Sequence, residues 1–193
     1  MREHCSKCHF PVRTCICHAV TSVKNRTEII ILQHPKEACH AKNTVKLLNL
    51  SLTNIAIFVG KTAQDFALLR HKLSTTPAAT AVFYPSPDST VICAAKKTAT
   101  PGIERAIFID ASWKQAFGIW QRNSWLNTFP FYQLPSDYTG QYRIRRSSLA
   151  HSFSTLEAVA YGLQQIESME PTPLLHLLDA FTSGWQGFIP GCD

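Results

Sequence analysis

The chain has 193 residues, of which 45% are hydrophobic and 17% charged, a composition typical of a globular protein that excludes an extended disordered chain. No apolar run approaches the roughly 20 residues that a membrane-spanning helix needs. The amino-terminal segment also lacks the apolar core of a secretory signal, so we expect a cytoplasmic protein without a membrane partner. The formal charge of +6 permits a polyanionic partner such as RNA without requiring one.

Four of the seven cysteines lie within the first 17 residues, as Cys5-x-x-Cys8 followed by Cys15-x-Cys17. Four thiolates in one short segment suffice for a closed tetrahedral zinc site, and a site with no position left for water is structural. Small buried thiols or a redox pair are the alternatives. The odd number of cysteines in a chain without a secretion signal argues against a disulfide framework.

Short apolar runs alternate with amphipathic segments along the rest of the chain. This alternation predicts an α/β fold in which helices flank a mostly parallel sheet. Ser154 and Glu157 have the spacing of a capping box, which predicts a helix start there. The predicted strands are residues 27–33, 54–59, 80–84, 106–109 and 131–134, and the predicted helices are residues 38–49, 65–73, 173–184 and segments beginning near Ser112 and at Ser154.

Asp110 follows the most apolar part of the predicted strand 106–109 and precedes a helix that carries Trp113. Parallel α/β sheets bind ligands at the carboxyl ends of their strands, so this corner is the first candidate for a functional site. The alternative for Asp110 is that it caps the helix that begins near Ser112. For Trp113, the alternative is a place in the core.

Other polar and loop residues also follow predicted strands. His34 and Lys36 come after residues 27–33, although a strand terminus and a solvated lysine explain them equally well. Residues 138–153 form a long loop that carries Arg143, Arg145 and Arg146, and loops of this length in compact domains are usually functional.

Four motifs occur in a fixed order: the cysteine cluster, LQHPKE at residues 32–37, DASW at residues 110–113 and STLEA at residues 154–158. In these motifs and their order the chain resembles the DTW-domain family, the tRNA-uridine aminocarboxypropyltransferases, nearly from end to end. Ser112 stands where the family usually has threonine and keeps the hydroxyl. The segment Phe117-Gly118-Ile119 departs from the basic pattern that usually follows the tryptophan.

The resemblance implies that S-adenosylmethionine donates its 3-amino-3-carboxypropyl group to N3 of a uridine in tRNA. It also implies a knotted, SPOUT-like fold, with a four-cysteine zinc module at residues 1–22 and a catalytic domain at residues 23–193. Under this hypothesis Asp110 is the general base, Ser112 a hydrogen-bond donor or cap, and Trp113 a stacking partner for adenine or uracil.

The remaining site residues are assigned on the same resemblance and on their places at strand ends. Gln33, His34, Pro85 and Leu134 are expected around the adenosine. The carboxylate of S-adenosylmethionine is expected to bind Arg143, Arg145 and the amides of Ser154 and Thr155. Phosphate contact or solvation is the alternative for the arginines.

Basic residues near the cysteine cluster and the arginine loop are expected to bind tRNA, and we expect a monomer rather than a dimer. Two other functions fit the sequence: a SPOUT-type methyltransferase that uses the same substrate donor but transfers methyl, and a noncatalytic, zinc-stabilised RNA-binding protein.

Overall fold

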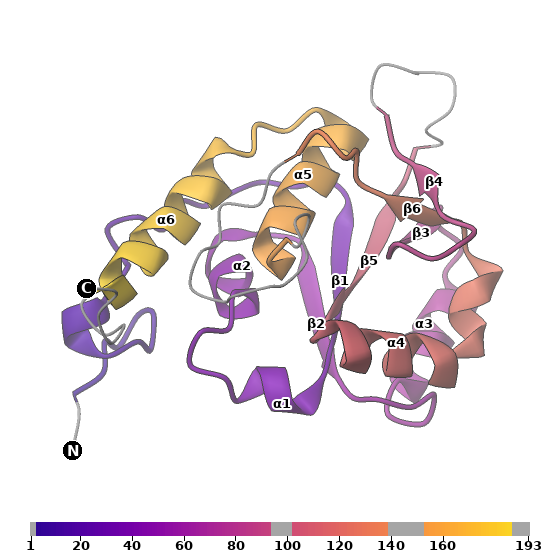
Figure 1. Ribbon diagram of the computed structural model, residues 1–193, viewed down its shortest axis with the longest axis horizontal. Coiled ribbons are helices and arrows are strands. Elements are labelled where there is room, and N and C mark those ends of the chain that lie inside the picture. The colour runs from indigo at the N-terminus through magenta and orange to yellow at the C-terminus, as the bar shows by residue number, and fades with distance from the viewer. Residues whose placement is uncertain (1–2, 94–101, 139–152, 187–193) are drawn as a thin grey trace.

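A six-stranded sheet, all of whose pairs are parallel, forms the centre of the protein. The computed structural model describes residues 3–93, 102–138 and 153–186 (Figure 1). The strand order is β2-β1-β5-β3-β6-β4. The strands are β1 Glu28–Gln33, β2 Ile55–Val59, β3 Thr80–Phe83, β4 Thr90–Val91, β5 Arg105–Asp110 and β6 Phe131–Gln133. The predicted parallel α/β sheet is confirmed, and β4 is an addition too short for the sequence pattern to indicate.

The helices follow the predicted order with one difference. They are α1 Pro35–Ala38, α2 Val45–Ser51, α3 Ala67–Thr75, α4 Trp113–Arg122, α5 Thr155–Glu167 and α6 Thr172–Gln186, with 3-10 turns η1 Val12–Thr14 and η2 Ser124–Thr128. The single helix predicted at residues 38–49 is wrong, because a polar turn separates α1 from α2. In that turn Asn43 Nδ2 donates to the Glu37 carbonyl at 2.9 Å and Asn43 Oδ1 accepts from the Val45 amide at 2.8 Å.

Helices cover both faces of the sheet (Figure 1). One face packs against α2, α5, α6 and the cysteine segment, and the other against α3, α4 and η2. Strand β1 contributes side chains to the cores on both faces of the sheet. Ile29 and Ile31 point to the core under α2, α5 and α6, and Ile30 and Leu32 point to the core under α3 and α4. All four side chains are fully buried, as the continuous apolar run predicts for a central parallel strand.

Helix α5 packs closely against β5. A Cβ atom at Gly162 would lie 2.8 Å from Phe108 Cζ. The Phe108 ring is itself stacked on Phe83 with 4.8 Å between centroids, so it has little room to move. The absence of a side chain at residue 162 therefore sets how near α5 lies to the carboxyl ends of the central strands.

Strand β5 lies between β1 and β3, so the fifth strand of the chain enters the middle of the sheet. A SPOUT-like knot stays a prediction, because the chain between β6 and α5 runs through residues 139–152, outside the described residues. Within the described ranges, no helix combines the length and the apolar character needed to cross a bilayer.

Candidate active site

The last residues of two neighbouring strands meet at the carboxyl edge of the sheet. Gln33 ends β1 and pairs in register with Asp110, which ends β5. Gln33 Nε2 donates to Asp110 Oδ2 at 2.8 Å, and the His34 amide donates to the Asp110 carbonyl at 2.9 Å. Because both Gln33 and Asp110 are buried, this pairing fixes the carboxylate in a single orientation.

Helix α5 supplies the second side of the site. Thr155, its first residue, donates its hydroxyl to Asp110 Oδ1. Ser154 caps the helix, and Glu157 Oε2 accepts from the Ser154 amide at 2.7 Å and hydroxyl at 2.8 Å, which confirms the predicted capping box. The amino-terminal end of α5 therefore faces the Asp110 carboxylate. Two donors, Gln33 Nε2 and the Thr155 hydroxyl, and the dipole of α5 stabilise its negative charge.

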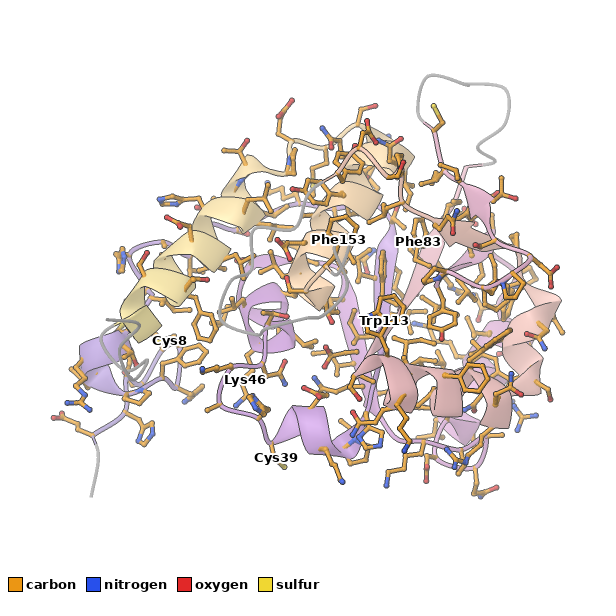
Figure 2. All side chains as sticks on the ribbon, viewed as in Figure 1. Cys8, Cys39, Lys46, Phe83, Trp113 and Phe153 are labelled. Carbon is orange, nitrogen blue, oxygen red and sulfur yellow. The ribbon has the colours of Figure 1, made fainter. Side chains whose placement is uncertain are left out.

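Helix α4 begins at Trp113 with a cap of its own. Ser112 occupies the N-cap position, and Gln115 Oε1 accepts from the Ser112 amide at 3.2 Å and hydroxyl at 2.9 Å. Asp110 is thus not the N-cap of this helix. Trp113 is 45% exposed, so its alternative assignment to the core is wrong. Figure 2 shows Trp113 at the start of α4, the helix that follows β5.

His34 follows Gln33 at the end of β1 and is the N-cap of α1. Its Nδ1 accepts from the Lys36 amide at 3.2 Å, so the proton of the neutral ring is placed on Nε2. Burial lowers the pKa of His34 below its ordinary value of 6.5, and the nearby Lys61 and Lys36 charges lower it further. The ring is therefore neutral at physiological pH.

The structure brings together Gln33, His34, Asp110, Ser154 and Thr155 and places the other predicted site residues farther along the edge. Pro85 follows β3 and is exposed, while Leu134 follows β6 and is half-buried against the first core. Arg143 and Arg145 lie outside the described residues. No sequence motif marked Lys61 and Arg122, which the fold brings near His34; the signal available was that one follows β2 and the other ends α4.

The four amino-terminal cysteines form a separate cluster. Cys5 and Cys17 sulfurs lie 3.6 Å apart, Cys8 and Cys15 sulfurs 3.7 Å apart, and all four lie within 4.8 Å of one another. Tetrahedral zinc–thiolate bonds of about 2.3 Å place sulfurs about 3.8 Å apart, so the cluster fits a metal ion. Backbone N–H groups of Cys8 and Lys7 lower the pKa of Cys5 to about 6, whereas burial raises the pKa of Cys17 to about 12. A cation is what would allow all four sulfurs to ionise together.

A parallel α/β sheet with a hydrogen-bonded carboxylate at its carboxyl edge defines the class: a ligand-binding α/β domain with a cysteine cluster able to hold a metal. The model of the DTW domain matches residues 2–186. The chain therefore belongs to the DTW domain family.

Curated relatives carry a common name. The chain is 31% identical over 134 residues to tRNA-uridine aminocarboxypropyltransferase A of Arabidopsis thaliana, covering 60% of this chain and 49% of that protein. It is 26% identical to tRNA-uridine aminocarboxypropyltransferase 2 of Mus musculus and 30% identical to that of Drosophila melanogaster, each over 86% of this chain and over 57% and 68% of the relative. The chain thus spans about half to two thirds of the length of these relatives. No solved structure matches it.

Proposed function

We propose that this protein transfers the 3-amino-3-carboxypropyl group of S-adenosylmethionine to N3 of a uridine in tRNA. Membership of the DTW domain family and the names of the curated relatives support the reaction. The structural observation that carries the proposal is the carboxylate of Asp110, which Gln33 and Thr155 hold at the carboxyl edge of the sheet.

The reaction needs a base because N3 of uracil is protonated and poorly nucleophilic. Asp110 accepts the N3 proton as N3 attacks the γ-carbon of the methionyl chain. The N3–Cγ bond forms and the Cγ–S bond breaks, so its electron pair returns to the sulfonium and neutral methylthioadenosine leaves. Attack at Cγ rather than at the methyl group is a matter of orientation, which rigid donors around the site supply.

The binding site for S-adenosylmethionine is assigned to the strand ends around Asp110. Gln33, His34, Pro85 and Leu134 surround the adenosine, and the Thr155 amide with Arg143 and Arg145 binds the carboxylate. The Ser154 amide, which was expected to join them, already donates to Glu157. The indole of Trp113 is exposed beside Asp110 and is available to stack on adenine or uracil. A knotted, SPOUT-like connection between β6 and α5 belongs to the same proposal.

We assign zinc to the cluster of Cys5, Cys8, Cys15 and Cys17, in a structural role. All four ligand positions are sulfur, which leaves none for water or substrate. The metal would fix a segment that packs on the carboxyl-terminal helix, where the rings of Phe10 and Phe181 lie 5.3 Å apart.

Product analysis tests the reaction. Purified protein incubated with S-adenosylmethionine and unmodified tRNA should yield methylthioadenosine and a nucleoside carrying the aminocarboxypropyl group on uridine, as seen by mass spectrometry. Release of S-adenosylhomocysteine with a methylated nucleoside would establish a methyltransferase instead. Retained tRNA binding without calorimetric binding of S-adenosylmethionine would establish a noncatalytic RNA-binding protein.

A further inference from the structure

Helix α4 exposes two large aromatic side chains on one flank. Trp113 is 45% exposed and Phe117 is 52% exposed, and residues four positions apart on a helix lie side by side. Phe117 packs edge-on against Trp120 with 5.8 Å between centroids, and Trp120 packs in turn against Tyr84 at 5.6 Å. The Phe117 ring is therefore held by a packed neighbour while about half of its surface stays uncovered.

The opposite flank of α4 carries a cation. At about 100° per residue, Arg122 lies roughly half a turn around the helix from Trp113 and Phe117. The residue after it, Asn123, is fully buried and donates its Nδ2 to the Lys61 carbonyl at 3.0 Å. This hydrogen bond ties the carboxyl-terminal end of α4 to the loop after β2, and the charges of Lys61 and Arg122 both act on His34.

A third cation lies in α1, the short helix after β1. The Gly60 amide donates to the Gln33 carbonyl at 3.0 Å, which joins the ends of β1 and β2, and Lys36 lies one turn farther on in α1. Lys36, Lys61 and Arg122 are all exposed. In the part of the chain that the structure describes, no carboxylate forms an ion pair with any of them.

Two carboxylates lie near these cations. The Asp65 Oδ2 atom already accepts from the Lys61 amide and from the amide and hydroxyl of Thr62, at 2.9 to 3.0 Å, and serves to fold the loop. Glu37 is buried within α1. The Lys61 charge acts on Asp65, yet among the described residues no ion pair joins Lys36, Lys61 or Arg122 to a carboxylate, so these side chains can bind an anion from outside the chain.

Exposed aromatic rings on one flank and cations on the other suit a single class of ligand. Unpaired RNA presents the π-faces of its bases on one side and its phosphates on the other. Proteins bind it by stacking aromatic side chains on the bases and placing cations at the phosphates. The helix begins three residues after Asp110, so RNA lying along it reaches the candidate base.

We propose that α4, together with Lys36 and Lys61, forms a ridge that binds the unpaired RNA segment next to the reacting uridine. Phe117 and Trp113 stack on bases, and Lys36, Lys61 and Arg122 bind phosphates. We call these five residues the α4 ridge. The proposal rests on the proposed function, because it takes the RNA substrate from it, and it adds the residues that hold the strand.

The salt dependence of tRNA binding separates the two flanks. Phe117→Ala should weaken tRNA binding about tenfold while leaving the slope of log K against log salt unchanged, because stacking releases no counterions. Phe117→Tyr should restore the affinity. Lys61→Gln and Arg122→Gln should each lower the slope by about 1. The full chain and an unmodified tRNA transcript are used throughout.

The control variants remove one exposed apolar side chain and one exposed positive charge away from the ridge. Leu68→Ala removes a side chain that is 84% exposed on α3, and Lys24→Gln removes an exposed charge at the opposite edge of the sheet, before β1. Both controls should bind tRNA like the wild type. Melting curves and calorimetric titration with S-adenosylmethionine should be the same for all variants.

Three results would overturn the α4 ridge: ridge variants that bind tRNA like their controls, ridge variants that lose S-adenosylmethionine affinity instead, or a Phe117→Ala variant that dissociates a dimer without losing tRNA affinity. Each of these results counts against the α4 ridge when the wild-type protein itself transfers the aminocarboxypropyl group. A wild-type protein that makes no such product contradicts the proposed function itself, which distinguishes the two failures.

Discussion

Gln33 and Asp110 lie 77 positions apart in the chain, yet they are register partners at the ends of adjacent parallel strands and are joined by a 2.8 Å hydrogen bond. Thr155 completes the arrangement by donating to the other carboxylate oxygen from the start of α5. The backbone of two strands and one helix therefore determines where the Asp110 carboxylate points.

Asp110→Asn should abolish the base without removing the shape of the side chain. We expect kcat to fall at least about 100-fold, the contribution of a positioned general base. Binding of S-adenosylmethionine and tRNA should persist in calorimetric and fluorescence titrations. Ser112→Ala is the control, because it removes the cap of α4 and costs about 1 kcal/mol of stability but no proton acceptor. Unchanged turnover of the asparagine variant would refute the base assignment.

Thr155→Val tests whether the hydroxyl positions the carboxylate. Valine keeps the backbone amide and a similar shape and removes only the donor to Asp110. We expect kcat to fall about tenfold because the base loses its fixed orientation, with the KM for S-adenosylmethionine unchanged, and Thr155→Ser should recover activity. A raised KM with normal kcat would mean that the hydroxyl serves the substrate donor instead.

His34→Asn should change how stability depends on pH. Burial lowers the pKa of His34 in the folded state, so the unfolded chain binds a proton more readily. Above pH 6.5 His34 is neutral in both the folded and the unfolded state, so its burial costs no protonation free energy. As the pH falls below 6.5 toward the lowered pKa of the folded state, the unfolded chain binds a proton that the folded protein does not, and the free energy of unfolding decreases. Asparagine still caps α1 but does not titrate.

The measurement is urea unfolding of both proteins at about pH 7.5 and about pH 6.0 with saturating zinc. The wild type should lose more unfolding free energy than the variant, at most about 1.4 kcal/mol more per pH unit. Cysteine protonation affects both proteins equally and cancels in the difference. Parallel pH profiles would show that His34 titrates normally in the folded protein.

Removal of metal should destabilise the whole protein rather than the amino-terminal segment alone, because Cys8 and Phe10 pack in the same core as α6. We expect one zinc per chain by elemental analysis. Chelation, or the Cys8→Ser substitution, should lower Tm by at least about 5 °C, which corresponds to roughly 2 kcal/mol in a protein of this size. Cys39→Ser, at an exposed thiol outside the cluster, should leave both metal content and Tm unchanged.

Gly162→Ala should destabilise the protein, unlike the same substitution at Gly118. At residue 162 the new methyl group would lie 2.8 Å from a buried, stacked Phe108 ring, and such overpacking costs about 1–3 kcal/mol. At residue 118 it would meet only the flexible end of Arg122, so Ala should stabilise α4 by up to about 1 kcal/mol. Chemical unfolding of the two variants provides the test, and equal effects would contradict the packing argument.

Features that depend on residues close together in the chain could be predicted from the sequence. The spacing of Ser154 and Glu157 predicts the capping box that begins α5, since both partners lie in one helical turn. The cysteine spacing predicts a cluster able to hold a metal for the same reason. Apolar, β-branched runs predict the buried strands, because only a strand covered on both faces has no polar side.

Which strand ends meet could not be predicted from the sequence and is seen only in the folded protein. Strand order and register depend on packing between segments far apart in the chain, so no local pattern could place β5 between β1 and β3 or join Gln33 and Thr155 to Asp110. The same holds for Trp113, whose helical spacing suits a core position as well as the exposed flank that it occupies. Whether an aromatic side chain on an amphipathic helix is covered depends on what the fold packs against that flank, and the sequence of the helix does not contain this information.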